Sequence, residues 1–362
     1  MLGKFIENLA NSRHLTADQV RVSVEQLIDE AGPAQQKADF LCSLALKGET
    51  VDEIAWFAQA LREKSVEPPI DPVWRENHSI LDVCGTGGDR LNTFNISTTV
   101  ALICASVGIP VAKHGNRAIT SQCGSADVLE ALGIRIDLPP VEAVRSLQER
   151  NFAFFFAPNY HPAFKHIGPA RRLCSDRGQR TIFNFLGPLL NPARPVAQLV
   201  GVPRPDLCSP LARVLQTLGV RRGMVVSGEV HENSRPETSN CEPEASNAKV
   251  FLDELSTLGP NRIAEFYQRN GCLSSTLGIA QFNLQQATLE DLAGGNREAN
   301  ASIVRRIVSG QERGPKRDAV LLNAAAALSV ADRASNLGEG WRIAEEAIDN
   351  GNVEAKLREL AD

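Results

Sequence analysis

The first part of the chain has apolar residues at the spacing of amphipathic helices. Through residues 14–64 they recur every three or four positions, which places them on one face of a helix. Thr16-Ala17-Asp18-Gln19 and Thr50-Val51-Asp52-Glu53 both fit capping boxes. Pro33 is placed to open a helix between them. The pattern predicts three helices, followed by a proline-rich linker at Glu67–Pro72.

The pattern changes near residue 80. Short apolar runs, typical of buried strands, now alternate with helical patterns. This alternation predicts an α/β fold, with a mostly parallel sheet flanked by helices, in a large domain at 73–362 that follows a small α-helical domain at 1–72. The predicted strands are Ile80–Cys84, Ile109–Ala112, Ile134–Asp137, Ala153–Ala157, Ala197–Val202 and Gly223–Ser227. The predicted helices are Val100–Val107, Ala126–Leu132, Val141–Arg150, Asp206–Leu218 and Ala319–Ala331.

Glycine and polar residues follow the first two predicted strands. Gly85-Thr86-Gly87-Gly88-Asp89 comes directly after the first strand, and glycines let a backbone turn sharply and present N–H groups to a ligand. Asn95, Ser97 and Thr98 stand at the mouth of the next helix, where N–H groups favour an anion. The second strand leads into Lys113-His114-Gly115-Asn116-Arg117. Together these loops predict a phosphate site, with neither P-loop nor dinucleotide-fold spacing.

Composition narrows the class of protein. The chain is 43% apolar and 22% charged, as in soluble globular proteins, and its net charge of −5 argues against a general nucleic-acid or anionic-membrane surface. Eight cysteines are scattered without a CxxC pair. The start of the chain lacks a signal-peptide pattern, and no uncharged apolar run is long enough to span a bilayer. A cytoplasmic location is therefore expected.

Several motifs, taken in order, carry a resemblance to a known family. They are GTGGD (85–89), NTFNIST (92–98), KHGNR (113–117), GSAD (124–127), APNYHPA (157–163), RTIFNFLGPLLNP (180–192) and GPKRDAVLLNAAAAL (314–328). With these the chain resembles the anthranilate phosphoribosyltransferase family over nearly its whole length.

The resemblance implies an activity and an architecture. The activity is transfer of phosphoribose from 5-phosphoribosyl diphosphate to the amine of anthranilate in tryptophan biosynthesis, with diphosphate released. The architecture is nucleoside phosphorylase/phosphoribosyltransferase-like, with a segment near 165–190 joining the helical domain. The resemblance also implies a homodimer with small-molecule substrates, and no nucleic-acid or membrane partner.

The resemblance also implies the site residues. It gives His114 no firm catalytic role and offers no convincing general base. Anthranilate contacts are implied for Gly85, Asn116 and Arg171, and a magnesium ion (Mg2+) for Ser97, Asp253 and Glu254. Contacts to 5-phosphoribosyl diphosphate are implied for Gly85, Gly88, Asp89, Thr93, Asn95, Ile96, Ser97, Thr98, Lys113, Ser121 and Ser125.

Two departures from the family pattern leave alternatives open. Arg180 falls nine positions after Arg171, a longer connector than the family has, so either Arg171 or Arg172 holds the carboxylate of anthranilate. Residues 229–249 form an insertion rich in Glu, Ser, Asn and Pro, expected to be a mobile surface segment. These departures leave open the interpretation that the chain is a paralogue that uses another aromatic acceptor. A pyrimidine nucleoside phosphorylase or a nucleic-acid-binding paralogue fits the motifs and the charge less well.

Overall fold

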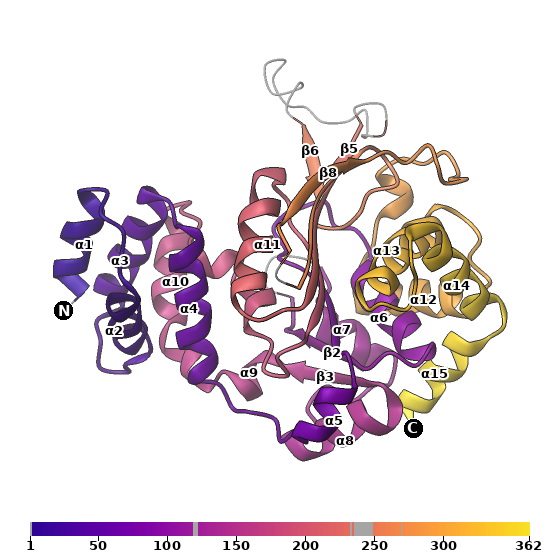
Figure 1. Cartoon of the computed structure of the whole chain (residues 1–362), viewed down its shortest axis with the longest axis horizontal. Coiled ribbons are helices and arrows are strands. Elements are labelled where there is room, and N and C mark those ends of the chain that lie inside the picture. Colours follow the sequence, from indigo (N-terminus) through magenta and orange to yellow (C-terminus); the bar gives the residue numbers. More distant parts are fainter. Residues whose placement is uncertain (1, 119–121, 232–233, 235–248, 269) are drawn as a thin grey trace.

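A computed structural model describes residues 2–118, 122–231, 234, 249–268 and 270–362. The N-terminal helices lie together at one side of the molecule (Figure 1). Three of them confirm the predicted helices, and both predicted capping boxes are present, at Thr16 and Thr50. The helix at the very start was not predicted; it buries Leu2, Phe5 and Leu9 in the bundle. The four helices are α1 (Leu2–Ala10), α2 (Ala17–Ile28), α3 (Ala34–Lys47) and α4 (Val51–Glu63).

The central sheet is mostly parallel, as predicted. Its strand order is β3-β2-β1-β4-β5-β7-β8, with β6 also paired to β5. The first five strands in this order run parallel, β6 and β7 each pair antiparallel with β5, and β8 pairs antiparallel with β7. Because β2 and β4 lie on opposite sides of β1, the carboxyl end of β1 is a topological switch point, where ligands bind in open α/β sheets. The strands are β1 (Leu81–Gly85), β2 (Val111–Gly115), β3 (Phe152–Phe156), β4 (Ala197–Gly201), β5 (Arg222–Val230), β6 (Val250–Leu252), β7 (Asn261–Tyr267) and β8 (Leu273–Leu277).

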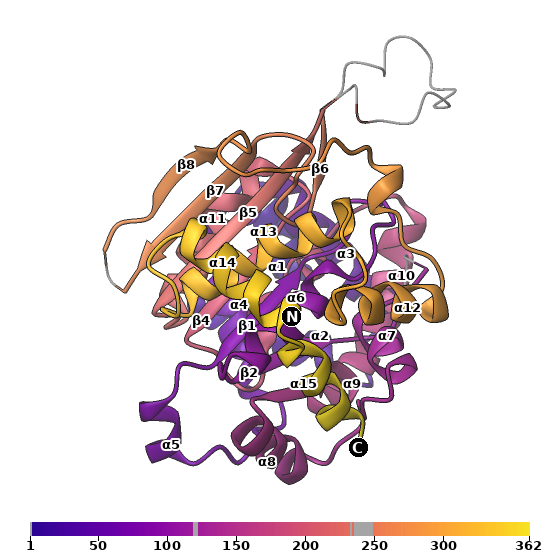
Figure 2. The ribbon, with the colours of Figure 1, turned by 90° about the vertical axis from the view of Figure 1, so that its right-hand side faces the viewer.

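Side chains on the two faces of the sheet pack into two different hydrophobic cores. Val83 and Leu199 point into one core, while their neighbours Cys84 and Val200 point into the other, as period-2 alternation requires. The first core contains the helices that connect the strands and the C-terminal helices, seen on the right in Figure 1 and turned toward the viewer in Figure 2. These helices are α6 (Ile96–Ser106), α7 (Ser125–Ala131), α12 (Arg297–Val308), α13 (Pro315–Val330), α14 (Leu337–Asp349) and α15 (Asn352–Ala361).

The second core joins the N-terminal bundle to later parts of the chain. Ile167, Ala170 and Cys174 are buried in it with residues of α2, α3 and α4, and Leu211 and Leu215 come from the sheet side. The middle of the chain therefore contributes to the same core as the first sixty residues. The elements between β3 and β5 are α9 (Ala157–Tyr160), η1 (Pro162–His166), α10 (Gly168–Asp176), η2 (Ile182–Asn184), η3 (Gly187–Leu190), η4 (Pro205–Leu207) and α11 (Cys208–Thr217).

Two predicted features differ in the structure. Ile134–Asp137 forms no strand; its Ile134 and Ile136 are buried in the first core on an irregular link between α7 and α8 (Pro140–Arg150). The alternation of apolar residues thus reflected burial without strand pairing. At the insertion, Glu229 and Val230 belong to β5, and Lys249 Nζ lies 2.9 Å from Glu229 Oε1. The expected mobility concerns residues that are mostly outside the described ranges.

The linker leads into a short helix, α5 (Pro72–Asn77), before the sheet begins. The isolated turn η7 (Glu290–Leu292) precedes α12. Within the described ranges, no helix combines the length and the apolar character needed to cross a bilayer.

Candidate functional site

The glycine loop after β1 is shaped by contact with a distant acidic residue. The N–H of Gly87 donates to Asp253 Oδ2 at 2.6 Å across 166 positions of sequence. A Cβ on Gly85 would lie 2.1 Å from Asp253 Oδ2, so no other residue fits there without displacing the carboxylate. Gly87 and Gly88 have φ of +74° and +87°, which L side chains rarely adopt. The glycines are therefore needed for both close approach and backbone conformation.

Three carboxylates gather beside this loop. Burial and the nearby charges of Asp89 and Glu254 raise the pKa of Asp253 well above its usual range. Burial likewise raises the pKa of Glu254, against the opposing attraction of Lys113. Asp89 Oδ2 is buried and has no hydrogen-bond partner. Like charges held this close favour a bound cation, which would neutralise the repulsion.

The N-terminus of α6 meets the acidic pair from the other side. Ser97 N–H donates to Glu254 Oε1 at 3.2 Å. Lys113, only 2% exposed, donates from Nζ to Val83 O at 2.7 Å and to Ser97 Oγ at 3.4 Å. Thr98 Oγ1 is buried without a partner. Donor groups for an anion and acceptor groups for a cation thus stand side by side.

A helix far along the chain fixes the acidic segment. Asn323 on α13 is fully buried, and its Oδ1 accepts from Leu255 N–H at 2.9 Å while its Nδ2 donates to Leu255 O at 2.9 Å. The backbone of the residue next to Glu254 is therefore clamped by one amide side chain. Asn323 lies in the motif at 314–328, and these contacts give it a structural role beside the acidic pair.

A row of rings leads from β2 to α10. The ring centroids of His114 and His161 are 5.2 Å apart, those of His161 and Phe164 4.9 Å, and those of Phe164 and Phe183 5.9 Å. The Arg171 guanidinium carbon lies 5.4 Å from the centre of the Phe183 ring. This row forms a largely apolar wall with an arginine at one end and an imidazole at the other.

The surroundings of both imidazoles in this row favour the neutral form. Burial lowers the pKa of His114 to about 3, with a further contribution from His161. Burial lowers the pKa of His161 to about 4. His114 Nδ1 lies 3.3 Å from Gly187 O, a contact that requires the proton on Nδ1 and leaves Nε2 as an acceptor. His114 Nε2 and both nitrogens of His161 are buried without partners.

Arg171 is the better placed of the two candidate arginines. It is partly buried, and burial lowers the pKa of its guanidinium. Within the described residues no ion pair involves Arg171, whereas Arg172 is exposed. A partly buried guanidinium without a carboxylate suits an anionic ligand.

The remaining residues of the predicted site lie around α6 and the loop after β2. Asn95 Nδ2 donates to Cys123 O at 3.4 Å, and Ser125 Oγ donates to Asn116 O at 3.5 Å. Thr93 forms an isolated bridge with Ala293, and Ile96 is buried as the first residue of α6. Ser121 lies outside the described residues.

Sequence reasoning missed two contributors. Arg180 Nη2 donates to Gly88 O at 3.3 Å, which brings a guanidinium to the glycine loop. His161 entered the sequence analysis only within the family motif at 157–163 and received no role in the site. Nearby Phe154 and Phe155 are buried core residues, whereas both ring nitrogens of His161 are buried without hydrogen-bond partners. A histidine beside proline after a strand end was the signal available.

The donor set suits magnesium. Among the described residues no group of three or more His, Cys, Asp and Glu side chains is arranged to hold a metal by itself. Magnesium does not need such a cage, because it is commonly held by one or two carboxylates together with water and substrate phosphates. Asp253 and Glu254, with the unpartnered oxygen of Asp89, fit that mode of binding.

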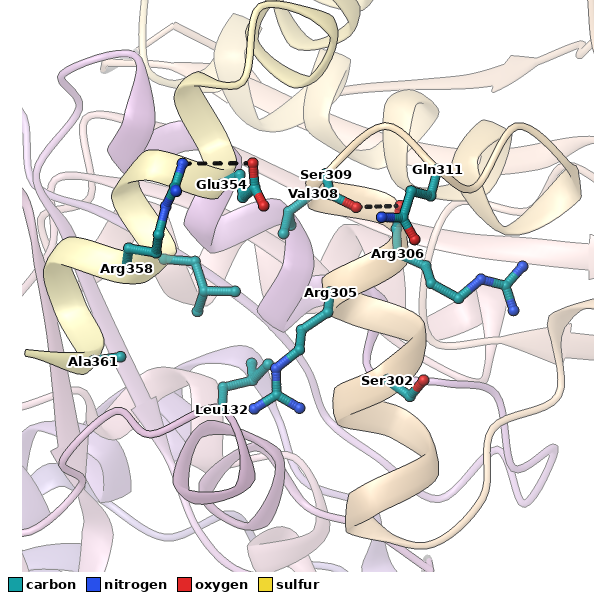
Figure 3. A pocket seen from close by; sticks show the side chains of 11 residues that line it. Leu132, Ser302, Arg305, Arg306, Val308, Ser309, Gln311, Glu354, Arg358 and Ala361 are labelled. Carbon is teal, nitrogen blue, oxygen red and sulfur yellow. Dashed lines mark hydrogen bonds and ion pairs between the residues drawn. The ribbon is translucent and has the colours of Figure 1, made fainter.

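A separate pocket of about 320 Å3 lies away from these residues, between α12 and α15 (Figure 3). Its arginines are engaged: Arg306 pairs with Glu312 at 2.5 Å, Arg358 with Glu354 at 3.5 Å, and Arg305 donates to Ala131 O at 2.7 Å. It shares no residue with the predicted site, so the chemistry is assigned to the strand ends. Its lining is Leu132, Ser302, Arg305, Arg306, Val308, Ser309, Gln311, Glu354, Leu357, Arg358 and Ala361.

Comparisons with known proteins agree over the whole chain. The glycosyl transferase family, a/b domain, matches residues 77–250 and 246–354, and the glycosyl transferase family, helical bundle domain, matches residues 4–65. The anthranilate phosphoribosyltransferase of Herpetosiphon aurantiacus is 41% identical over 356 residues, covering 98% of this chain and 96% of that protein. The enzyme of the same name from Moorella thermoacetica is 42% identical, covering 99% and 97%.

Solved structures give the same result. An anthranilate phosphoribosyltransferase from Thermus thermophilus matches with a TM-score of 0.83 and 36% identity, covering 98% of both chains. One from Saccharomyces cerevisiae, in complex with PRPP and Mg, matches with a TM-score of 0.83 over 100% of this chain and 97% of that one. At 24% identity, the yeast likeness shows the fold alone.

Proposed function

Because the chain belongs to the anthranilate phosphoribosyltransferase family, we propose that its site transfers phosphoribose from 5-phosphoribosyl diphosphate to the amine of anthranilate. In this step of tryptophan biosynthesis the bond from C1 of the ribose to diphosphate breaks, and a bond from C1 to the amine nitrogen forms. The amine loses a proton and diphosphate leaves. The observation that carries the proposal is the acidic pair held against both the glycine loop and the N-terminus of α6.

The donor diphosphate is assigned to the glycine loop and the start of α6. Backbone N–H groups, Lys113 and the guanidinium of Arg180 supply positive charge where a polyanionic leaving group departs. Asp89, Asn95, Ser97 and Thr98 supply polar groups around it. The other assigned donor contacts are Gly85, Gly88, Thr93, Ile96, Ser121 and Ser125.

Magnesium is assigned to Asp253 and Glu254, with Ser97 beside them. When bound, the ion would neutralise charge on the diphosphate as it leaves. The chain's own part is to hold two carboxylates in place through Gly87 N–H, Ser97 N–H and the Asn323 clamp on Leu255.

Anthranilate is assigned to the row of rings. Arg171 offers a guanidinium fork for the carboxylate, and the apolar rings suit the aromatic face. His114 Nε2 is an acceptor that can orient the attacking amine. With a pKa of about 3 it is a weak base, so we assign it positioning and no proton transfer. Asn116 and Gly85 complete the assigned acceptor contacts.

We further propose that the chain works as a homodimer in the cytoplasm. The proposed dimerisation unit is the helical domain, residues 1–72 together with the segment near 165–190, which share one core. Leu46 on α3 is 77% exposed, an apolar side chain available to a partner.

The test measures initial rates from the loss of anthranilate fluorescence, with magnesium varied at fixed donor concentration. The parent should consume anthranilate only when the diphosphate donor is present. Asp253→Asn with Glu254→Gln keeps shape and removes two charges, so it should need much more magnesium for half-maximal rate. The control Glu345→Gln with Glu346→Gln removes two partly exposed charges from α14. An unchanged magnesium dependence in the first double variant would contradict the assignment of the metal.

A further inference from the structure

Helices α3 and α10 meet along a seam that contains two thiols. Cys42 on α3 and Cys174 on α10 are both free, and their Sγ atoms lie 3.5 Å apart across 132 positions of sequence. A disulfide requires a sulfur–sulfur distance of about 2.05 Å. The two sulfurs are thus already in contact, and a movement of about 1.5 Å would bring them to bonding distance.

The two thiols have different surroundings. Cys42 is partly exposed, and Arg177 donates from Nη1 to its Sγ at 3.8 Å and to Asp39 Oδ1 at 2.9 Å. Susceptibility to oxidation rises with the exposure of the thiol, and Cys42 is the more exposed of the two. Cys174 is 1% exposed and donates to Ala38 O at 3.6 Å. Burial, reinforced by Cys42, raises the pKa of the Cys174 thiol to about 12. An oxidant therefore reaches Cys42 first, and Cys174 supplies the sulfur that reacts with the oxidised Cys42.

We propose that Cys42 and Cys174 form an oxidation site at which hydrogen peroxide converts the two thiols into an intramolecular disulfide. The Cys42 sulfur attacks one peroxide oxygen, the O–O bond breaks, and Cys42 becomes a sulfenic acid as one water leaves. The Cys174 sulfur then attacks the Cys42 sulfur, the S–O bond breaks, and the departing hydroxide takes the thiol proton of Cys174 as a second water. The thiols lose two electrons, and hydrogen peroxide gains them.

The disulfide has a consequence for acceptor binding, which rests on the proposed function. Arg171 lies one turn before Cys174 on α10, so drawing Cys174 toward α3 also displaces the guanidinium assigned to the carboxylate. Displacements of about 1 Å at a positioning group can cost up to roughly 100-fold in rate. Oxidation should therefore raise the KM for anthranilate on the order of 10-fold and leave the KM for the donor nearly unchanged.

The test treats the full chain with hydrogen peroxide and maps its tryptic peptides by mass. Trypsin releases Cys42 in ADFLCSLALK (38–47) and Cys174 in LCSDR (173–177). The expected product is these two peptides joined, about 2 Da lighter than their sum, and separated again by dithiothreitol. The link should be absent in Cys42→Ser and Cys174→Ser. It should persist in the control Cys272→Ser, which removes another partly exposed thiol.

The outcomes separate the two parts of the inference. The absence of a linked peptide in the parent overturns the oxidation site. So does sulfinic acid at Cys42 that accumulates as fast in the parent as in Cys174→Ser. A linked peptide without a change in the KM for anthranilate overturns the coupling to Arg171. A reduced parent that does not consume anthranilate refutes the proposed function, and the mass measurement is unaffected by that failure.

Discussion

Arg171 illustrates how a single side chain can be prepared for an anionic ligand. Its guanidinium packs over Phe183 and is partly buried, yet it has no ion pair among the described residues. Arg172 is adjacent in sequence but exposed, because neighbouring residues on a helix point about 100° apart. The longer connector before Arg180 therefore has not moved Arg171 away from the row of rings.

Arg171→Ala should raise the KM for anthranilate far more than that for the donor. Losing a charge-assisted bidentate contact costs about 1.5–3 kcal/mol, or roughly 10- to 150-fold. Steady-state kinetics with each substrate varied in turn measure this. Arg172→Ala is the matched control and should change neither KM appreciably. The reverse pattern would assign the carboxylate to Arg172.

At the level of secondary-structure elements, α13 acts on the site without contributing a ligand to it. The helix is buried on nearly every side, and Asn323 projects from it to the backbone of Leu255. The acidic pair lies on the short link between β6 and β7, which no regular hydrogen-bond ladder holds. Two side-chain amides supply a restraint instead: Asn323 bonds the backbone of Leu255, and Asn261 bonds the backbone of Ser256.

Asn323→Ala should weaken both the fold and the metal site. It leaves the N–H and C=O of Leu255 without their partner, and each buried unsatisfied group costs about 1–3 kcal/mol. Urea denaturation should show a lower free energy of unfolding, and rate measurements should show a higher magnesium requirement. Ser329→Ala on the same helix is the control, because Ser329 Oγ is buried without a hydrogen bond. Equal effects of the two substitutions would refute the clamp.

Across the molecule as a whole, the row of rings joins the sheet to the helical side. His114 lies in β2, His161 lies between α9 and η1, and Phe183 lies in η2. His161 is buried at this junction and His114 is partly buried, and burial favours the neutral form of both imidazoles. Protonating them inserts charge where there is little to compensate it, so the stability of the folded chain depends on pH.

Stability should fall as pH falls from about 6.5 toward 4. The ordinary pKa of 6.5 for His161 is lowered to about 4 in the folded chain. In this window the unfolded chain binds a proton that the folded chain does not. The contribution of His161 is therefore complete above pH 6.5 and lost on approaching pH 4, with a slope of about 1.4 kcal/mol per pH unit.

The measurement is urea denaturation from about pH 4 to about pH 7.5, which spans this window. His161→Gln should show a shallower loss of unfolding free energy than the parent, by up to about one proton's slope. His14→Gln, which removes an exposed histidine, should follow the parent. A parent and His161→Gln with parallel pH profiles would contradict a neutral, buried His161.

Features that depend on neighbouring residues could be predicted from the sequence. Capping boxes at Thr16 and Thr50, the strand before Gly85 and the helix after Asn95 each depend on residues within a few positions, and each is present. The family motifs, which run from residue 85 to residue 328, added the activity. The separate roles assigned to the site residues remain predictions for the experiments above.

Contacts between segments that are far apart in sequence could be identified only in the folded chain. Asp253 meets Gly87 across 166 positions, and Asn323 meets Leu255 across 68. Arg180 reaches Gly88 across 92, while Ile134–Asp137, strand-like in pattern, finds no strand to pair with. Periodicity records which side chains are buried, but pairing and approach depend on how the two cores bring remote segments together. The acidic pair could be identified in the sequence because it lies within a local family pattern. The residues that hold it, Gly87 and Asn323, are far away in sequence and could be identified only from the folded chain.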